Sequence, residues 1–93
     1  MAIAMLVDNP SGSQEVYDKV RANLGFSEDE LAEGGIVHVA GPSPNGGWRV
    51  IEVWESQEAM EKFVAERLGP ALKEAGVERP EPQRWEVYNL VKR

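Results

Sequence analysis

The chain has 93 residues, of which 42% are hydrophobic and 28% are charged, and its net charge is −6. This length predicts a single domain over residues 1–93, and the lack of an evident basic patch argues against nucleic-acid binding. The chain has no cysteine, which excludes disulfides and thiolate metal sites, so we expect no bound metal. A cytoplasmic location fits, because Met1–Val7 lacks the basic flank of a signal peptide. No apolar run reaches the roughly 20 residues that span a bilayer.

The first half of the chain alternates strand and helix patterns. Residues 2–7 are apolar on both faces and predict a strand. After a turn, Ser11 and Gln14 have the spacing of a capping box, which predicts that a helix begins there. A second strand is expected over 36–40. The glycine- and proline-rich residues 41–47 then predict a hairpin loop.

The third predicted strand, over residues 48–55, has large apolar groups on both of its faces. Side chains alternate between the two faces of a strand. One face therefore carries Trp48, Val50, Glu52 and Trp54, and the other carries Arg49, Ile51, Val53 and Glu55. A single layer of helices covers only one of these faces, so the pattern indicates that something else covers the second.

The strand runs into a second helix almost without a loop. Ser56 is a good N-cap residue, and the helix is expected to end at Gly76. Pro70 lacks an N–H group and predicts a kink or break near Gly69. A stiff, charged connector over 78–82 then leads to a fourth strand, predicted over 84–91.

The element order is therefore β-α-β-β-α-β. Two right-handed crossovers predict a ferredoxin-like α+β fold with a four-stranded antiparallel sheet and two helices on one face. The open face of that sheet would expose more apolar surface than monomers usually show. We therefore predict a homodimer in which two sheets pack face to face, about 10 Å apart.

The strand ending and the helix start together form a short motif. It has the pattern "E-x-W-E-S" followed by "E-A-x-x-x-F/H", and the matching residues are Glu52, Trp54, Glu55, Ser56, Glu58, Ala59 and Phe63. In this motif and in its element order the chain resembles the antibiotic-biosynthesis-monooxygenase-like group of the dimeric α/β-barrel superfamily. The resemblance implies a dimeric α/β barrel. It also implies a range of activities that includes cofactor-free oxygenases of quinols or polyketide phenols, haem-degrading enzymes and isomerases.

The chain departs from that group at one position. Several of the group's enzymes carry a histidine on the second helix, where Leu68 stands here. The departure argues against haem degradation, and against any quinol oxidation that depends on that histidine.

His38 is the candidate catalytic residue, because it is the only histidine and imidazole ordinarily titrates near neutral pH. The hairpin places it across from Val50 or Glu52. If it faces Glu52, the two form a general base with its orienting carboxylate. The alternative is a core or interface histidine that makes one hydrogen bond. Glu52 itself needs a partner, since a buried carboxylate is costly. His38 or Arg84 fits that role, whereas Arg49 points to the opposite face.

Aromatic and polar side chains at element ends and inner faces predict a flat pocket that stacks a polycyclic ligand. Asn89 in the last strand adds a donor for a ligand carbonyl or oxyanion. The alternative is that these residues only fill the core. The candidate substrate-binding residues are Tyr17, Glu52, Trp54, Phe63, Trp85 and Asn89.

The leading hypothesis is a small-molecule-binding protein that acts as a cofactor-independent monooxygenase on an aromatic or quinone-like substrate. It is expected to need no cofactor and to have a second copy of itself as partner, with no nucleic acid and no membrane. The alternative is a non-catalytic dimeric module with a structural or stress-associated role. A cavity of ~300 Å³ or more with His38 or Glu52 on its wall would favour the first hypothesis, and a solid core the second.

Overall fold

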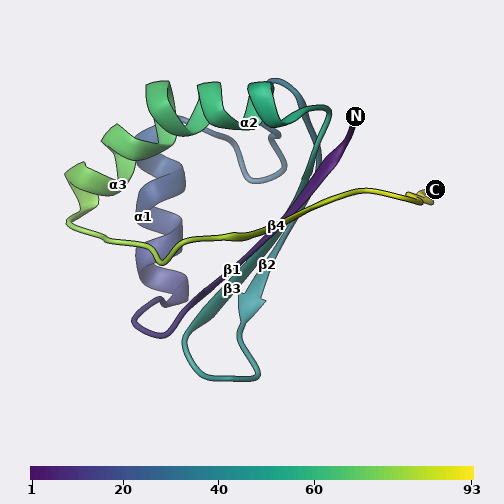
Figure 1. Ribbon diagram of the computed structural model, residues 1–93. Coiled ribbons are helices and arrows are strands. Elements are labelled where there is room, and N and C mark those ends of the chain that lie inside the picture. Colours follow the sequence, from purple (N-terminus) through teal and green to yellow (C-terminus); the bar gives the residue numbers. More distant parts are fainter.

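A four-stranded antiparallel sheet with strand order β2-β3-β1-β4 has all of its helices on one face (Figure 1). The computed structural model describes residues 1–93. This arrangement is the predicted ferredoxin-like α+β fold. The elements are, in chain order, β1 (Ile3–Asn9), α1 (Gln14–Leu24), β2 (Gly35–Pro42), β3 (Trp48–Trp54), α2 (Gln57–Phe63), a π-helical segment η1 (Val64–Leu68), α3 (Gly69–Ala75) and β4 (Gln83–Glu86).

Helix α1 begins later than its sequence pattern predicts. Its N-cap is Ser13, whose hydroxyl oxygen accepts a hydrogen bond from the Val16 N–H at 3.2 Å. Ser11 belongs instead to the preceding turn, where its N–H donates to Asn9 Oδ1 at 3.1 Å. The Asn9 carbonyl also accepts from the Gly12 N–H. The prediction of Ser11 as the cap was therefore wrong, because Asn9 holds Ser11 and Gly12 in a turn.

Pro70 disrupts the second helical region near Gly69, as predicted. Helix α2 passes into the π-helical segment η1, and α3 follows with Pro70 in its first turn. A proline ring clashes with the carbonyl four residues earlier. The turns of the π-helical segment are wider than those of an α-helix, so the Gly69 N–H donates to the Val64 carbonyl rather than to the Glu66 or Ala65 carbonyl. The helical path then continues to Gly76, which ends it with φ 72°. No helix combines the length and the apolar character needed to cross a bilayer.

Strand β4 is shorter than the predicted span 84–91. It covers Gln83–Glu86, pairs only with β1, and its last residue lies opposite Ile3, the first residue of β1. One further hydrogen bond joins the Val87 N–H to the Ala2 carbonyl. The residues that follow have no strand residue opposite them, and the C-terminal segment runs past the sheet (Figure 1).

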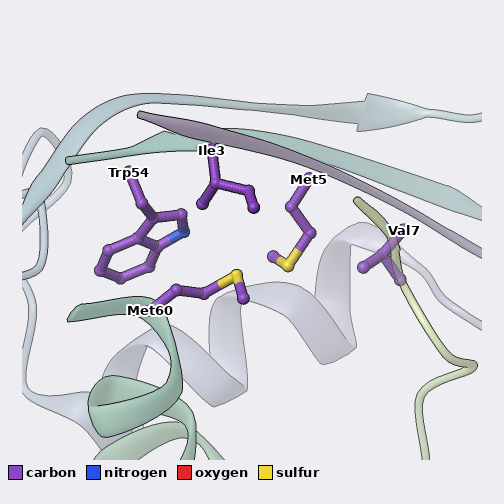
Figure 2. Packing of buried hydrophobic residues seen from close by; sticks show 5 residues of the cluster. All are labelled: Ile3, Met5, Val7, Trp54 and Met60. Atoms are coloured by element: carbon purple, nitrogen blue, oxygen red, sulfur yellow. The ribbon is translucent and has the colours of Figure 1, made fainter. Parts of the chain in front are cut away.

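The main core cluster lies between the sheet and the helical layer. Ile3, Met5 and Val7 of β1 point toward the helices and meet Trp54 and Met60 (Figure 2). Trp54 is 2% exposed, and its replacement by alanine is expected to cost roughly 3–5 kcal/mol. Only ten of the 93 residues are buried. A chain with so small a core gains stability from association.

The opposite face of the sheet has no helix over it (Figure 1). Residues directly opposite in an antiparallel pair share a face. Ile51 of β3 lies opposite Leu6 of β1 and opposite Val39 of β2, so all three are on the open face. Trp85 shares this face through its pairing with Ala4. Val39 and Trp85 are 53% and 48% exposed. The predicted division of the sheet into a core face and an open apolar face is confirmed.

Asp8 and Arg49 form a two-pronged ion pair on the open face, with both N–O distances at 2.7 Å. The hydrogen bond from Arg49 lowers the pKa of the Asp8 carboxyl from 3.8 to about 2. Because this pKa is lower in the folded chain than in the unfolded chain, the pair stabilises the fold above about pH 4, and that stabilisation is lost as the pH falls toward 2.

We expect Asp8→Asn to lower the melting temperature at pH 6, and the difference from wild type to shrink between about pH 4 and pH 2. Thermal melts followed by circular dichroism across this range measure it. Asp18→Asn, at an exposed position of α1, is the control. A difference that stays constant down to pH 2 would contradict the pairing.

Candidate functional site

A partly open cavity of about 130 Å³ lies between the sheet and the helical layer. Its wall is mainly apolar and includes Val20 and Leu24 of α1, Leu72 of α3, and Val7 and Val50 of the sheet. The volume is smaller than the ~300 Å³ that would favour the small-molecule hypothesis over the non-catalytic module, although His38 and Glu52 both lie on the wall. It is comparable to the roughly 150 Å³ cavity that accommodates benzene in an engineered protein core. The space therefore suits one aromatic ring.

His38 and Glu52 lie opposite each other on β2 and β3 and face this cavity. Their side chains are 21% and 14% exposed, and His38 Nδ1 lies 2.8 Å from Glu52 Oε2. Since a carboxylate only accepts, Nδ1 carries the proton and Nε2 is left as an acceptor. The expected partnership of His38 with Glu52 is confirmed. Arg49 bonds Asp8 on the other face instead.

The hairpin between β2 and β3 decides which face His38 occupies. Pro42 lies opposite Trp48 next to the loop, and the pairing continues without a shift to His38 opposite Glu52. The turn type and loop length of a hairpin fix such a register, and a slip of one residue would turn His38 to the other face. The β-bulge at Ile36 lies beyond this stretch, between Gly35 and Val37, and leaves the pairing of His38 unchanged.

Tyr17 of α1 completes a chain of hydrogen bonds across the cavity. Its hydroxyl donates to His38 Nε2 at 2.5 Å, and burial raises the pKa of the phenol, which keeps it protonated. At the other end, Trp54 Nε1 donates to Glu52 Oε1 at 3.3 Å. The four side chains form a satisfied polar path, with Tyr17 and His38 stacked at a centroid distance of 5.9 Å.

Two pairs of aromatic rings line the cavity. Trp54 lies against Phe63 at 5.4 Å between ring centroids, and Trp48 lies against Tyr17 at 5.6 Å. Trp48 Nε1 is buried without a hydrogen-bond partner, which is unusual, because buried donors are nearly always paired. Flat aromatic walls of this kind fit a planar ring.

The structure brings five of the predicted site residues to one cavity and places two elsewhere. Tyr17, His38, Glu52, Trp54 and Phe63 all lie on the cavity wall.

Trp85 and Asn89 are not on the wall. Trp85 lies on the open face of the sheet, since it pairs with Ala4, and Asn89 is exposed beyond the end of β4. Both residues were expected in the pocket. The register turns Trp85 to the open face, and β4 ends before it reaches Asn89.

Arg79 is the site residue that the sequence patterns missed. It lies in the connector between α3 and β4 that was expected to be only a charged spacer, and it reaches the cavity wall. Its one local signal is its position two residues after Val77, another residue of the wall.

His, Asp and Glu side chains nowhere form a group of three that could hold a metal ion. The ionisable groups of the cavity wall are instead the imidazole of His38, the phenol of Tyr17, the carboxylates of Glu30 and Glu52, and the guanidinium groups of Arg21 and Arg79. These groups suit proton transfer and the binding of a polar organic ligand.

The fold is that of antibiotic-biosynthesis-monooxygenase-like proteins. A candidate antibiotic biosynthesis monooxygenase from Chloroflexus aurantiacus superposes with a TM-score of 0.67 at 13% identity, over 99% of this chain and 98% of that one. A mutant of SnoaB, a cofactor-independent oxygenase from Streptomyces nogalater, gives a TM-score of 0.63 at 12% identity, over 99% and 97%. A conserved protein from Methanosarcina mazei Go1 gives 0.66 at 14% identity, over 91% of each chain. In sequence, neither a protein-family model nor a curated protein matches the chain.

The pairing with Glu52 predicts that neutral His38 carries its proton on Nδ1. Nitrogen-15 NMR of the imidazole distinguishes the two tautomers. We expect Glu52→Ala to remove the preference for Nδ1, because the acceptor is lost. Glu55→Ala is the control, since Glu55 is exposed and lies beyond the end of β3. An Nε2-protonated imidazole in the wild type would contradict the arrangement.

Proposed function

We propose that this protein binds a phenol or quinol ring in the cavity and oxidises it with molecular oxygen, without a metal or an organic cofactor. The observation that supports the proposal best is the Tyr17–His38–Glu52 chain on the wall of an apolar cavity of about 130 Å³. The likeness of the fold to SnoaB, a cofactor-independent oxygenase, agrees with it. A ligand of one ring fits the volume better than a polycyclic one.

The first step is proton removal from the ring hydroxyl. That hydroxyl donates to the Tyr17 oxygen while the Tyr17 proton passes to His38 Nε2. Glu52 holds the imidazole by Nδ1 and stabilises the imidazolium that forms. The surrounding apolar wall excludes water and strengthens these interactions. The result is an electron-rich ring anion.

The substrate itself supplies the electrons. The ring anion gives one electron to O₂, and the resulting radical and superoxide combine to form a carbon–oxygen bond. The peroxide takes up the proton held by His38 and loses water, which leaves one oxygen atom on the ring as a quinone carbonyl or hydroxyl. Overall, a quinol and O₂ give a hydroxyquinone and H₂O. The four electrons that reduce O₂ all come from the ring.

His38→Ala is expected to reduce quinol-dependent oxygen consumption by roughly 10²–10⁴-fold, the usual contribution of general acid–base catalysis. An oxygen electrode with hydroquinone measures the rate, and circular dichroism confirms folding. Tyr88→Phe is the control, because Tyr88 is exposed beyond β4. A His38→Ala variant with a lower melting temperature and unchanged turnover would show that the residue is structural.

We also propose that two copies of the chain associate through the open face of the sheet. That face carries Leu6, Ile51 and Val53, together with the exposed Val39 and Trp85. A flat apolar sheet surface is complementary to a second copy of itself under two-fold symmetry. Face-to-face packing at about 10 Å would bury both surfaces and enlarge the small core of each chain. The cavity lies on the opposite face and stays accessible.

Sedimentation velocity at micromolar concentration should give about twice the chain mass of 10.3 kDa. Val53→Lys should yield a monomer or an unfolded chain, because it would bury an unpaired charge in the interface. Ala22→Lys, on an exposed position of α1, should leave the dimer intact. A wild-type protein that sediments as a monomer would refute the proposed assembly.

A further inference from the structure

Arg79 is a cation on the cavity wall without a partner. Arg79 takes part neither in the His38–Glu52 hydrogen bond nor in the Asp8–Arg49 ion pair. Burial lowers the pKa of its guanidinium, and Glu52 and Glu81 counteract this through their charge alone, with no hydrogen bond. An arginine stays protonated under such conditions, so the cavity wall carries a guanidinium that neighbouring carboxylates attract but do not hydrogen-bond.

Glu52 acts on Arg79 through its charge and not through a hydrogen bond, because both of its oxygens are already engaged. Oε2 accepts from His38 at 2.8 Å, and Oε1 accepts from Trp54 at 3.3 Å. The Arg79 side chain is only partly buried, so its free N–H groups are open to a ligand in the cavity. Charged groups of this kind gather at functional sites, so the position of Arg79 suggests a ligand that completes its hydrogen bonding.

The shape of the guanidinium and the charges of the wall limit what that ligand is. The planar fork of N–H donors matches a carboxylate. The wall also carries Glu30 and Glu52, whose carboxylates repel a doubly charged phosphate more strongly than a singly charged carboxylate. The volume of about 130 Å³ and the aromatic wall leave room for one ring. The hydroxyl of that ring would meet Tyr17, as the proposed reaction requires.

We infer that the natural ligand is a single-ring phenol or quinol that carries a carboxylate, and that Arg79 binds this carboxylate. The inference rests on the proposed function, since it places the ring in the same cavity. It adds what the proposed chemistry leaves open, namely the charge of the substrate. In this arrangement Arg79 sets specificity, and the Tyr17–His38–Glu52 chain acts on the ring hydroxyl.

The test compares two probes that differ by one carboxylate, 2,5-dihydroxybenzoate and hydroquinone. Calorimetric titration under nitrogen measures binding without turnover. We expect the wild type to bind the carboxylate roughly 10- to 100-fold more tightly, the range of a charge-assisted hydrogen-bonded pair. Arg79→Gln should abolish this preference, whereas Arg79→Lys, which keeps the charge but not the fork, should retain part of it.

Arg84→Gln is the matched control, because it removes a nearby positive charge from β4 that is not on the cavity wall. It should leave the preference within about twofold of wild type. The melting temperature adds a second readout. If Arg79 is unpaired in the free protein, the melting temperature of Arg79→Gln should equal or exceed that of the wild type. If Arg79 makes a structural contact, the melting temperature of the variant would be lower.

The inference is overturned if the wild type shows no preference, if it does not bind 2,5-dihydroxybenzoate, or if Arg79→Gln retains the preference. Oxygen uptake in air separates this result from that of the proposed function. Hydroquinone oxidation without any preference for the carboxylate would leave the function standing and remove the inference. Arg79-dependent binding of the carboxylate without oxygen uptake would do the reverse.

Discussion

The register of one hairpin determines where the polar chemistry of this protein lies. The loop between β2 and β3 sets the pairing, so that His38 lies opposite Glu52 rather than opposite Ile51. In a register slipped by one residue the imidazole would be on the open face, and Glu52 would lie in an apolar wall without that partner, at a considerable cost. The hydrogen bond to Tyr17 depends on the same register, because α1 covers only the cavity face. The geometry of one loop thus brings residues from three elements into one chain.

The polar groups on the cavity wall are of two kinds. Tyr17, His38, Glu52 and Trp54 satisfy one another, and such a closed network is rigid and specific. Trp48 Nε1, beside Tyr17, is buried without an acceptor, and the partly buried Arg79 is in no ion pair. A satisfied network orients a proton acceptor before any ligand arrives. Unpaired donors can bond an acceptor that a ligand provides. The division matches a site in which one set of groups does the chemistry and another selects the molecule.

The one-sided helical layer separates two roles of the sheet. The side chains of Trp48, Val50, Glu52 and Trp54 serve the cavity, whereas those of Ile51 and Val53 lie on the open face. Because neighbouring residues in β3 point in opposite directions, substitutions for assembly and for chemistry can be made on the same strand with little interference. A chain with ten buried residues has little stability to spare, so association through the open face would also support the cavity.

The sequence alone determined the features that depend on local periodicity. The alternation in β3 defined its two faces, the element order predicted the sheet, Pro70 marked the helical break, and Glu52 required a partner such as His38. Non-local register decided the rest. It placed Trp85 on the open face opposite Ala4, and it ended β4 where β1 begins, which left Asn89 outside the sheet. The folding of the connector after α3 brought Arg79 to the cavity. No periodic pattern records such contacts, because they depend on which distant residues lie opposite each other once the whole sheet has formed.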